Sequence, residues 1–180
     1  MPLEPLAPLL KSWRRRPFWE PGVTTHAVAH DRAALERILE HRDPFFFIDT
    51  VTDVDLDDRC LRGRRRVDPS DPVFAGHFPG RPVYPAVLQL EIMGQLGLCL
   101  IHFCATKTAE IAIDAAPLAA RALKVHHALF PAEVGPGDEL TVLAKLLDSD
   151  AYTVTCAGQI IRDGTICAVA VMEVYLVGES

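Results

Sequence analysis

The stretch from Val83 to Phe103 constrains the fold more than any other part of this 180-residue chain. It is long enough for about six helical turns and is apolar on nearly every side, so a helix here has to be buried on most of its surface. Pro85 suits the first turn, where a missing backbone N–H costs no hydrogen bond. The apolar side chains of the stretch include Val87, Leu88, Leu90, Ile92, Met93, Leu96, Leu98, Leu100 and Ile101.

Strands are predicted to cover this helix. Alternating or β-rich segments occur at about 45–54, 60–67, 109–114, 118–130, 138–149 and 151–177. Asp163-Gly164 predicts a hairpin turn inside the last segment. A short helix over 32–40, with Asp31 as its N-cap, is expected to precede them. An antiparallel sheet wrapped around one long central helix buries the apolar surface of both, so we predict an α+β chain with a hot-dog fold.

Length and composition predict a single domain of this kind. The chain is too short for two ordinary domains, and 49% hydrophobic with 23% charged residues is typical of a globular protein. Residues 1–29 are rich in proline and arginine, and we expect an irregular N-terminal arm there, followed by one domain over 30–180. Trp13 and Trp19 suggest that the arm packs on something, for example a neighbouring subunit.

Composition also argues against several classes of function. The net charge of −6 disfavours nucleic-acid binding, which needs a basic footprint. The five scattered cysteines form no Cys-x-x-Cys pair, which predicts reduced thiols in a cytoplasmic protein and no metal site. His126 and His127 are expected to face opposite sides of a strand and lack metal-ligand spacing. We expect no secretory signal, and we expect no apolar run to reach the length needed to span a membrane.

The loop before the long helix and the first helical turns contain the candidate catalytic groups. His77 lies among glycines and prolines and can serve as a general base. Glu91 lies on the apolar helix, where burial should raise its pKa and keep a proton available for a leaving hydroxyl. Gln95 follows one turn later on the same face. Free amides at Ala86 and Val87 can stabilise a developing enolate oxygen. These groups suit removal of an α-proton followed by loss of a β-hydroxyl.

A long motif runs from this loop into the helix: Gly76-His77-Phe78-Pro79-Gly80-Arg81-Pro82-Val83-Tyr84-Pro85-Ala86-Val87-Leu88, followed by Leu90-Glu91 and Gln95. It closely resembles the signature of the FabZ-type 3-hydroxyacyl-[acyl-carrier-protein] dehydratases. The resemblance extends to His41-Arg42-Asp43-Pro44-Phe45 and to Val134-Gly135-Pro136-Gly137-Asp138, and it covers about residues 33–176.

The resemblance implies the roles of the site residues. His77 matches the catalytic histidine and Glu91 the catalytic acid, while the amides of Ala86 and Val87 lie where the thioester carbonyl binds. A glutamate here, in place of the aspartate of FabA-type enzymes, favours dehydration without isomerisation. The family normally has glycine where this chain has Ala86, and the added methyl would narrow the approach to the carbonyl. The supporting residues implied by the motif are Gln95, Gly76, Phe78, Gly80 and Tyr84.

The resemblance also implies the partners. It implies a homodimer in which His77 of one chain faces Glu91 of the other, and trimers of such dimers occur in the family. The substrate would arrive on the phosphopantetheine of an acyl carrier protein, with no metal or redox cofactor. Because carrier proteins are acidic, Arg81, Arg121 and Lys124 are candidate docking residues. The arm at 1–29 is absent from the compact members of the family.

The predicted function is dehydration of a (3R)-3-hydroxyacyl-[acyl-carrier-protein] to the trans-2-enoyl product, in fatty-acid synthesis or a specialised acyl or polyketide-type pathway. Two alternatives remain. Hot-dog folds also include acyl thioesterases, which attack the carbonyl with water. The change at Ala86, together with the arm, is also compatible with a catalytically weakened subunit that only binds acyl carriers.

Overall fold

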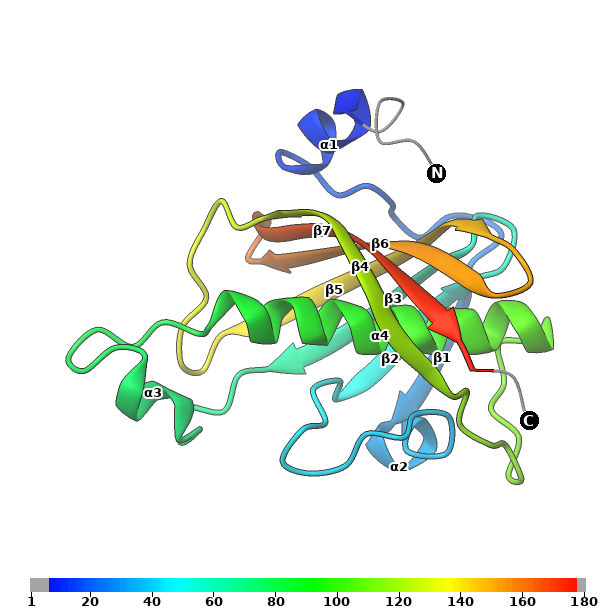
Figure 1. The fold of residues 1–180 in the computed structure, drawn as a ribbon, viewed down its shortest axis with the longest axis horizontal. Helices are drawn as coiled ribbons and strands as arrows, with labels where there is room; N and C mark the ends of the chain where they lie inside the picture. Colours follow the sequence, from blue (N-terminus) through cyan, green and yellow to red (C-terminus); the bar gives the residue numbers. More distant parts are fainter. Residues whose placement is uncertain (1–6, 178–180) are drawn as a thin grey trace.

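The computed structural model describes residues 7–177. Its centre is a seven-stranded antiparallel sheet in the order β1-β2-β3-β5-β6-β7-β4, and one long helix, α4, lies across one face of that sheet (Figure 1). The strands are β1 (His26–Asp31), β2 (Thr50–Asp55), β3 (Cys60–Arg66), β4 (Ala120–Leu129), β5 (Glu139–Ser149), β6 (Thr153–Arg162) and β7 (Thr165–Leu176). The helices are α1 (Ala7–Trp13), α2 (Arg32–Leu35), α3 (Val73–Gly76) and α4 (Ala86–Thr106).

Small residues on the sheet allow α4 to pack closely against it. A Cβ atom added to Gly158 of β6 would lie 2.5 Å from the Cβ of Met93, and one added to Gly63 of β3 would lie 2.8 Å from Cδ1 of Leu96. At Gly158 the contact is with the Cβ of Met93, which cannot move without the helix, and at Gly63 the added atom would also lie 3.0 Å from the carbonyl oxygen of Thr50. Glycine at both positions therefore allows the close approach of the helix. The predicted α+β fold, an antiparallel sheet wrapped around one long helix, is confirmed.

One predicted strand starts later than expected, and another is wrong. The segment predicted as a strand from Phe45 begins as one only at Thr50, because the backbone of Phe45 and Phe47 is hydrogen-bonded to the side chain of Gln95 instead of to a neighbouring strand. The segment 109–114 forms a loop in which Ile113 is almost fully exposed. The predicted helix over 32–40 is limited to the single turn of α2 followed by further turns.

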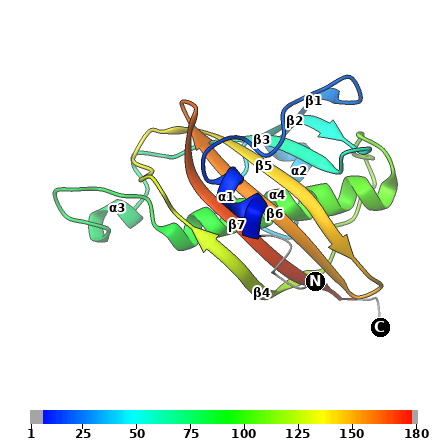
Figure 2. The same ribbon diagram turned by 90° about the horizontal axis from the view of Figure 1, so that it is seen from above.

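The N-terminal arm lies on the outer face of the sheet, opposite to α4 (Figure 2). Trp13 and Trp19 are 6% and 7% exposed and pack in a second apolar cluster with side chains of β3, β5, β6 and β7. The expectation of an irregular arm is wrong at α1 and at the start of β1, whereas residues 14–25 contain no helix or strand, as expected. Its tryptophans pack on the chain's own sheet and need no neighbouring subunit to be covered.

A buried glutamine of β6 fixes this arm. Gln159 is fully buried, and its Nε2 donates to the carbonyls of Trp13, at 2.5 Å, and Arg16, at 3.0 Å. The backbone N–H of Phe18 donates to Gln159 Oε1 at 3.1 Å. Because one side chain satisfies three backbone groups of the arm, the end of α1 has a defined position over β6.

Helix α4 is long and apolar enough, by length and composition alone, to cross a membrane, and it is the single such helix in residues 7–177. The expectation that no segment reaches this length is therefore wrong for α4. Most of the helix is buried against the sheet, and the core helix of a folded domain meets the same description.

Candidate active site

His77 is held in a defined orientation at the end of α3. Its backbone N–H donates to the carbonyl of Val73, and its own carbonyl accepts from the N–H of Val83 at 2.9 Å. The ring nitrogen Nδ1 lies 2.8 Å from the carbonyl oxygen of Val83. A carbonyl can only accept, so Nδ1 carries the proton and Nε2 presents a lone pair. The half-buried ring is therefore arranged as a base acting through Nε2.

The turn after His77 shapes the loop around it. The N–H groups of Phe78 and Arg81 each donate to the carbonyl of the other. Gly80 has a φ of +77°, which glycine adopts without strain. Phe78 stacks on the imidazole with ring centroids 4.0 Å apart and is itself 52% exposed. An exposed aromatic side chain beside the base is available to contact another molecule.

The first turn of α4 supplies free amides near this loop. Pro85 precedes the helix, and its carbonyl accepts from the N–H groups of Leu88 and Gln89. Within residues 7–177 the N–H groups of Ala86 and Val87 make no hydrogen bond. Ala86 is not among the residues with positive φ, so alanine fits this backbone and keeps its N–H. The start of α4 can thus present two donors to a carbonyl oxygen, as is typical of helix N-termini.

Glu91 forms a hydrogen-bonded group with two side chains. Its Oε1 accepts from Gln95 Nε2 at 2.8 Å and lies 3.2 Å from His41 Nε2. Burial acts to raise the pKa of Glu91, but these hydrogen bonds outweigh it and hold the pKa below its ordinary value of 4.5. The expectation of a raised pKa is therefore wrong for the single chain.

Gln95 links Glu91 to the segment before β2. Its Nε2 also donates to the carbonyl of Phe45 at 3.0 Å, and its Oε1 accepts from the N–H of Phe47 at 2.8 Å. Gln95 is almost completely buried. One amide thus fixes both the carboxylate of Glu91 and the segment that carries His41.

His41 is the residue that the residue-by-residue reasoning missed. It lies fifty positions before Glu91, so no helical or strand periodicity relates the two. The sequence signal for His41 is its place in the motif His41-Arg42-Asp43-Pro44-Phe45, which is part of the family resemblance. Its Nδ1 is buried and has no hydrogen-bond partner among the described residues.

The structure does not join the predicted base and acid within one chain. In the described part of the chain no hydrogen bond or ion pair links His77 to Glu91, and each has its own partners.

Tyr84 is 1% exposed and packs against Phe74, and burial raises its pKa to about 12. Gly76 forms the last residue of α3, directly before the histidine.

The three predicted docking residues lie in different environments. Arg81 is exposed beside the His77 loop, and its guanidinium forms an ion pair with Glu133. Arg121 lies over the ring of Tyr175, with 5.1 Å between its Cζ and the ring centroid. Lys124 is exposed on β4, the edge strand. Only Arg81 adjoins the candidate active site.

Histidines and cysteines outside the site show no metal cluster. Across residues 7–177 no group of three or more histidine, cysteine or acidic side chains is arranged to hold a metal ion, and the predicted lack of a metal stays a prediction. Burial raises the pKa of Cys60 to about 11 and those of Cys99 and Cys156 to about 12, so these thiols stay protonated.

An antiparallel sheet packed around one long central helix defines the hot-dog class of folds. Within this class the family is also clear. A family model described as a FabA-like domain matches residues 39–171, and the chain belongs to this FabA-like family.

Curated relatives support the same assignment. The chain is 35% identical over 148 residues to a 3-hydroxyacyl-[acyl-carrier-protein] dehydratase FabZ of Sorangium cellulosum, covering 82% of this chain and 91% of that protein. It is 33% identical over 147 residues to a FabZ of Campylobacter jejuni, covering 82% and 97%. The resemblance to FabZ-type dehydratases predicted from the sequence is confirmed.

Solved structures share the fold at lower identity. A dehydratase heterocomplex, ApeI:P, from Xenorhabdus doucetiae contains a chain with a TM-score of 0.62 and 19% identity, covering 81% of this chain and 91% of that one. A Ralstonia eutropha protein described as a candidate thioesterase gives a TM-score of 0.50 and 17% identity, covering 70% and 83%. Both likenesses confirm the hot-dog fold.

Proposed function

We propose that this protein removes water from a (3R)-3-hydroxyacyl group carried on the phosphopantetheine of an acyl carrier protein and releases the trans-2-enoyl thioester. His77 Nε2 takes the C2 proton, and the amides of Ala86 and Val87 bind the thioester oxygen as negative charge develops on it. Glu91 protonates the departing hydroxyl. The observation that carries the proposal is the orientation of His77, whose Nδ1 is held by Val83 so that Nε2 is the basic atom.

The acid role of Glu91 requires its carboxyl group to be protonated. In the single chain its side chain is 30% exposed, and hydrogen bonds favour the carboxylate. A second chain and an acyl group would remove the remaining water, which disfavours the charged form and raises the pKa. We propose that His41 is a positioning residue for this carboxyl. His41→Leu should lower kcat with little change in KM, and His41→Gln, which retains an N–H donor, should recover part of the loss. Equal losses in both variants would contradict a positioning role.

We propose a homodimer as the active unit. β4 is an edge strand, and its exposed Leu123 and Val125 form an apolar edge that a folded protein normally covers. Val87, at the start of α4, is 69% exposed in the single chain. Pairing of two copies would cover such surfaces and can bring His77 of one chain to Glu91 of the other. Measuring the mass in solution distinguishes this dimer from a trimer of dimers and from a heterocomplex such as that of the Xenorhabdus neighbour.

A mixed-dimer experiment tests this arrangement. His77→Ala and Glu91→Gln should each lower kcat by about 10²-fold or more, because each removes one proton-transfer group. If the site is shared between chains, refolding the two variants together restores one intact site in each mixed dimer. Half of the dimers are mixed and half of their sites are intact, so about a quarter of wild-type activity should return. Two inactive variants that stay inactive in verified mixed dimers would refute the shared site.

The reaction type is tested with a purified 3-hydroxyacyl thioester. A rise in enoyl absorbance indicates elimination, whereas release of free thiol indicates the thioesterase alternative. If the substrate binds but neither signal is observed, the protein is a weakened subunit that only binds acyl carriers. We further propose that the protein works in the cytoplasm on carrier-bound substrate, without a metal or redox cofactor, a membrane span or a nucleic-acid partner.

A further inference from the structure

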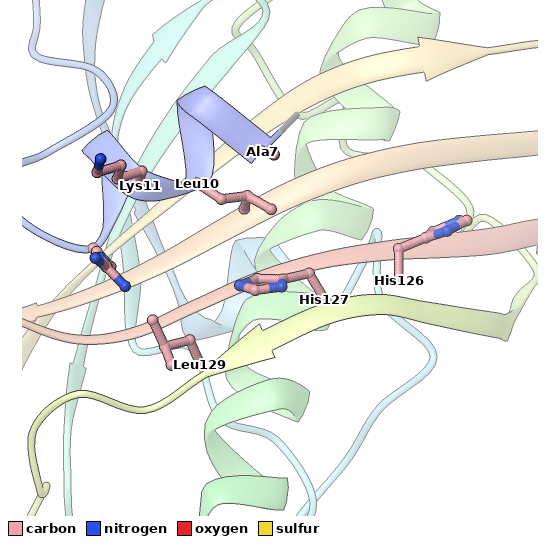
Figure 3. A pocket seen from close by; sticks show the side chains of 7 residues that line it. Ala7, Leu10, Lys11, His126, His127 and Leu129 are labelled. Atoms are coloured by element: carbon pink, nitrogen blue, oxygen red, sulfur yellow. The ribbon is translucent and has the colours of Figure 1, made fainter. Parts of the chain in front are cut away.

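A groove of about 460 Å³ lies between α1 and β4 on the outer face of the sheet (Figure 3). Helix α4 lies on the opposite face, and the His77 loop adjoins the start of α4, so the groove is separate from the candidate active site. In Figure 3 the labelled side chains of α1 and β4 lie on two sides of the same hollow. Its polar lining is formed by Lys11, Arg14, His126 and His127.

Two permanent cations form the α1 side of this groove. Lys11 lies in α1 and Arg14 directly after it, three residues apart, so both lie on the side of α1 that lines the groove. Both residues are exposed, and within residues 7–177 neither forms an ion pair with an acidic side chain. The chain as a whole has a net charge of −6. The positive character of the groove is therefore local and does not follow from the composition of the protein.

A β-bulge supplies the histidines on the other side. Val125 pairs with Met172 and His127 pairs with Val171, so His126 is an additional residue in β4 with no partner in the register. The expectation that the two histidines face opposite sides is therefore wrong, because the bulge lets both line the groove. His126 Nε2 contacts Glu173 Oε2 at 2.6 Å, which fixes the orientation of that ring. The ring of His127 makes no hydrogen bond to the described residues, 7–177.

The groove is preformed, because the arm is anchored where α1 ends. Gln159 holds the carbonyls of Trp13 and Arg16, the positions directly before and two after Arg14. Trp13 is buried against the sheet. The backbone that carries the cations is thereby fixed before a ligand binds, so only the side chains of Lys11 and Arg14 have to be ordered on binding.

We propose that this groove binds the phosphate group of a small organic phosphate. A phosphate monoester presents three strong acceptor oxygens, which match an ammonium, a guanidinium and an imidazole arranged on two sides. Leu10 and Leu129 line the same groove and can contact the organic part of the ligand. The volume lies in the range of small-molecule pockets, about 300–1,000 Å³. The site does not depend on the proposed dehydratase activity.

Calorimetric titration of the full chain at about 0.15 M salt, where exposed charges are screened beyond about 8 Å, tests the proposal with three separate ligands: inorganic phosphate, free 4′-phosphopantetheine, and a holo acyl carrier protein. Arg14→Gln should weaken the binding of phosphate about tenfold, since it removes a charge-assisted hydrogen bond. Arg15→Gln is the matched control, because Arg15 is an equally charged, exposed neighbour that does not line the groove. It should change the affinity by less than about twofold, as expected of a screened surface charge.

A second measurement localises the ligand independently of affinity. The ring resonances of His127 should shift on addition of phosphate to the wild-type protein and should not shift in Arg14→Gln. If both small ligands bind and Arg14→Gln weakens their binding, the site is assigned to a free organic phosphate. Binding of the holo carrier alone, with the same dependence, assigns it to the carrier's phosphopantetheine arm. Equal weakening by Arg14→Gln and Arg15→Gln, or no binding of any of the three at millimolar concentrations, overturns the proposal.

Discussion

Replacement of Gln159 by leucine should release the N-terminal arm from the sheet. The substitution retains a side chain of similar size but removes the hydrogen bonds to Trp13, Arg16 and Phe18. At about 1 kcal/mol for each hydrogen bond, the docked arm loses about 3 kcal/mol. The destabilisation of the whole protein cannot greatly exceed the free energy with which the arm packs on the sheet, because the backbone groups of a detached arm form hydrogen bonds to water instead. The effect should therefore be local, with the rest of the fold retained.

Tryptophan fluorescence measures this release directly, because the chain has two tryptophans and both lie in the arm. In Gln159→Leu the emission should move toward that of exposed tryptophan at a lower urea concentration than the loss of far-ultraviolet circular dichroism. In the wild type the two transitions should lie closer together. Gln89→Leu is the matched control, since Gln89 is an equally buried glutamine on α4, on the other face of the sheet.

The control should shift the circular dichroism transition without separating it from the fluorescence transition. The tryptophans of Gln159→Leu could instead stay buried to the same urea concentration as in the wild type, or the free energy of arm release could differ between the two proteins by less than about 1 kcal/mol. Either result would show that Gln159 does not hold the arm. Release of the arm should also weaken phosphate binding in the groove between α1 and β4. Gln159→Leu therefore tests both the anchoring of the arm and the phosphate site.

Three further changes test the core and the site. Gly158→Ala should destabilise the protein by about 1–3 kcal/mol in urea unfolding, because the added Cβ would lie 2.5 Å from the Cβ of Met93. Gly97→Ala is the control and should be tolerated, because its added Cβ would have its nearest contact at 3.6 Å. Ala86→Gly should retain the oxyanion N–H and raise kcat/KM for bulky acyl thioesters, as measured by enoyl absorbance; unchanged kinetics would show that the methyl does not narrow the site. The pKa of Glu91 is lowered in the folded chain, so its stabilising effect is complete above pH 4.5 and is lost as the pH falls through the folded value. The difference in unfolding free energy between wild type and Glu91→Gln should therefore shrink below pH 4.5, and a difference that grows there would contradict the direction of the shift.

Much of the fold could be predicted because its signals are local. The helix predicted over 83–103 is α4 at 86–106, and the hairpin turn at Asp163-Gly164 separates β6 from β7. Periodicity and turn residues report which face is buried and where a strand ends, and these properties are set within a few residues. The motif around His77 is likewise contiguous, so the base, the free amides and the family could be inferred without the fold.

Contacts between distant segments could be found only in the tertiary structure. Gln95 binds the backbone of Phe45 and Phe47 across about fifty residues, so the strand that their aromatic side chains predicted begins only at Thr50. The same fold brings His41 to Glu91, whose pKa falls although burial alone would raise it. No local pattern contains such information, because the energy of a buried polar group depends on partners that only the folded chain brings within hydrogen-bonding distance.

The arm shows the same division between sequence and structure. The sequence by itself determined that Trp13 and Trp19 had to be covered, since large aromatic side chains are stabilised by burial. Only the tertiary structure decided what covers them: a sheet face that includes a buried glutamine of β6, Gln159, with three backbone partners in the arm. It likewise decided, through one extra residue in β4, that His126 and His127 share a face with the cations of α1.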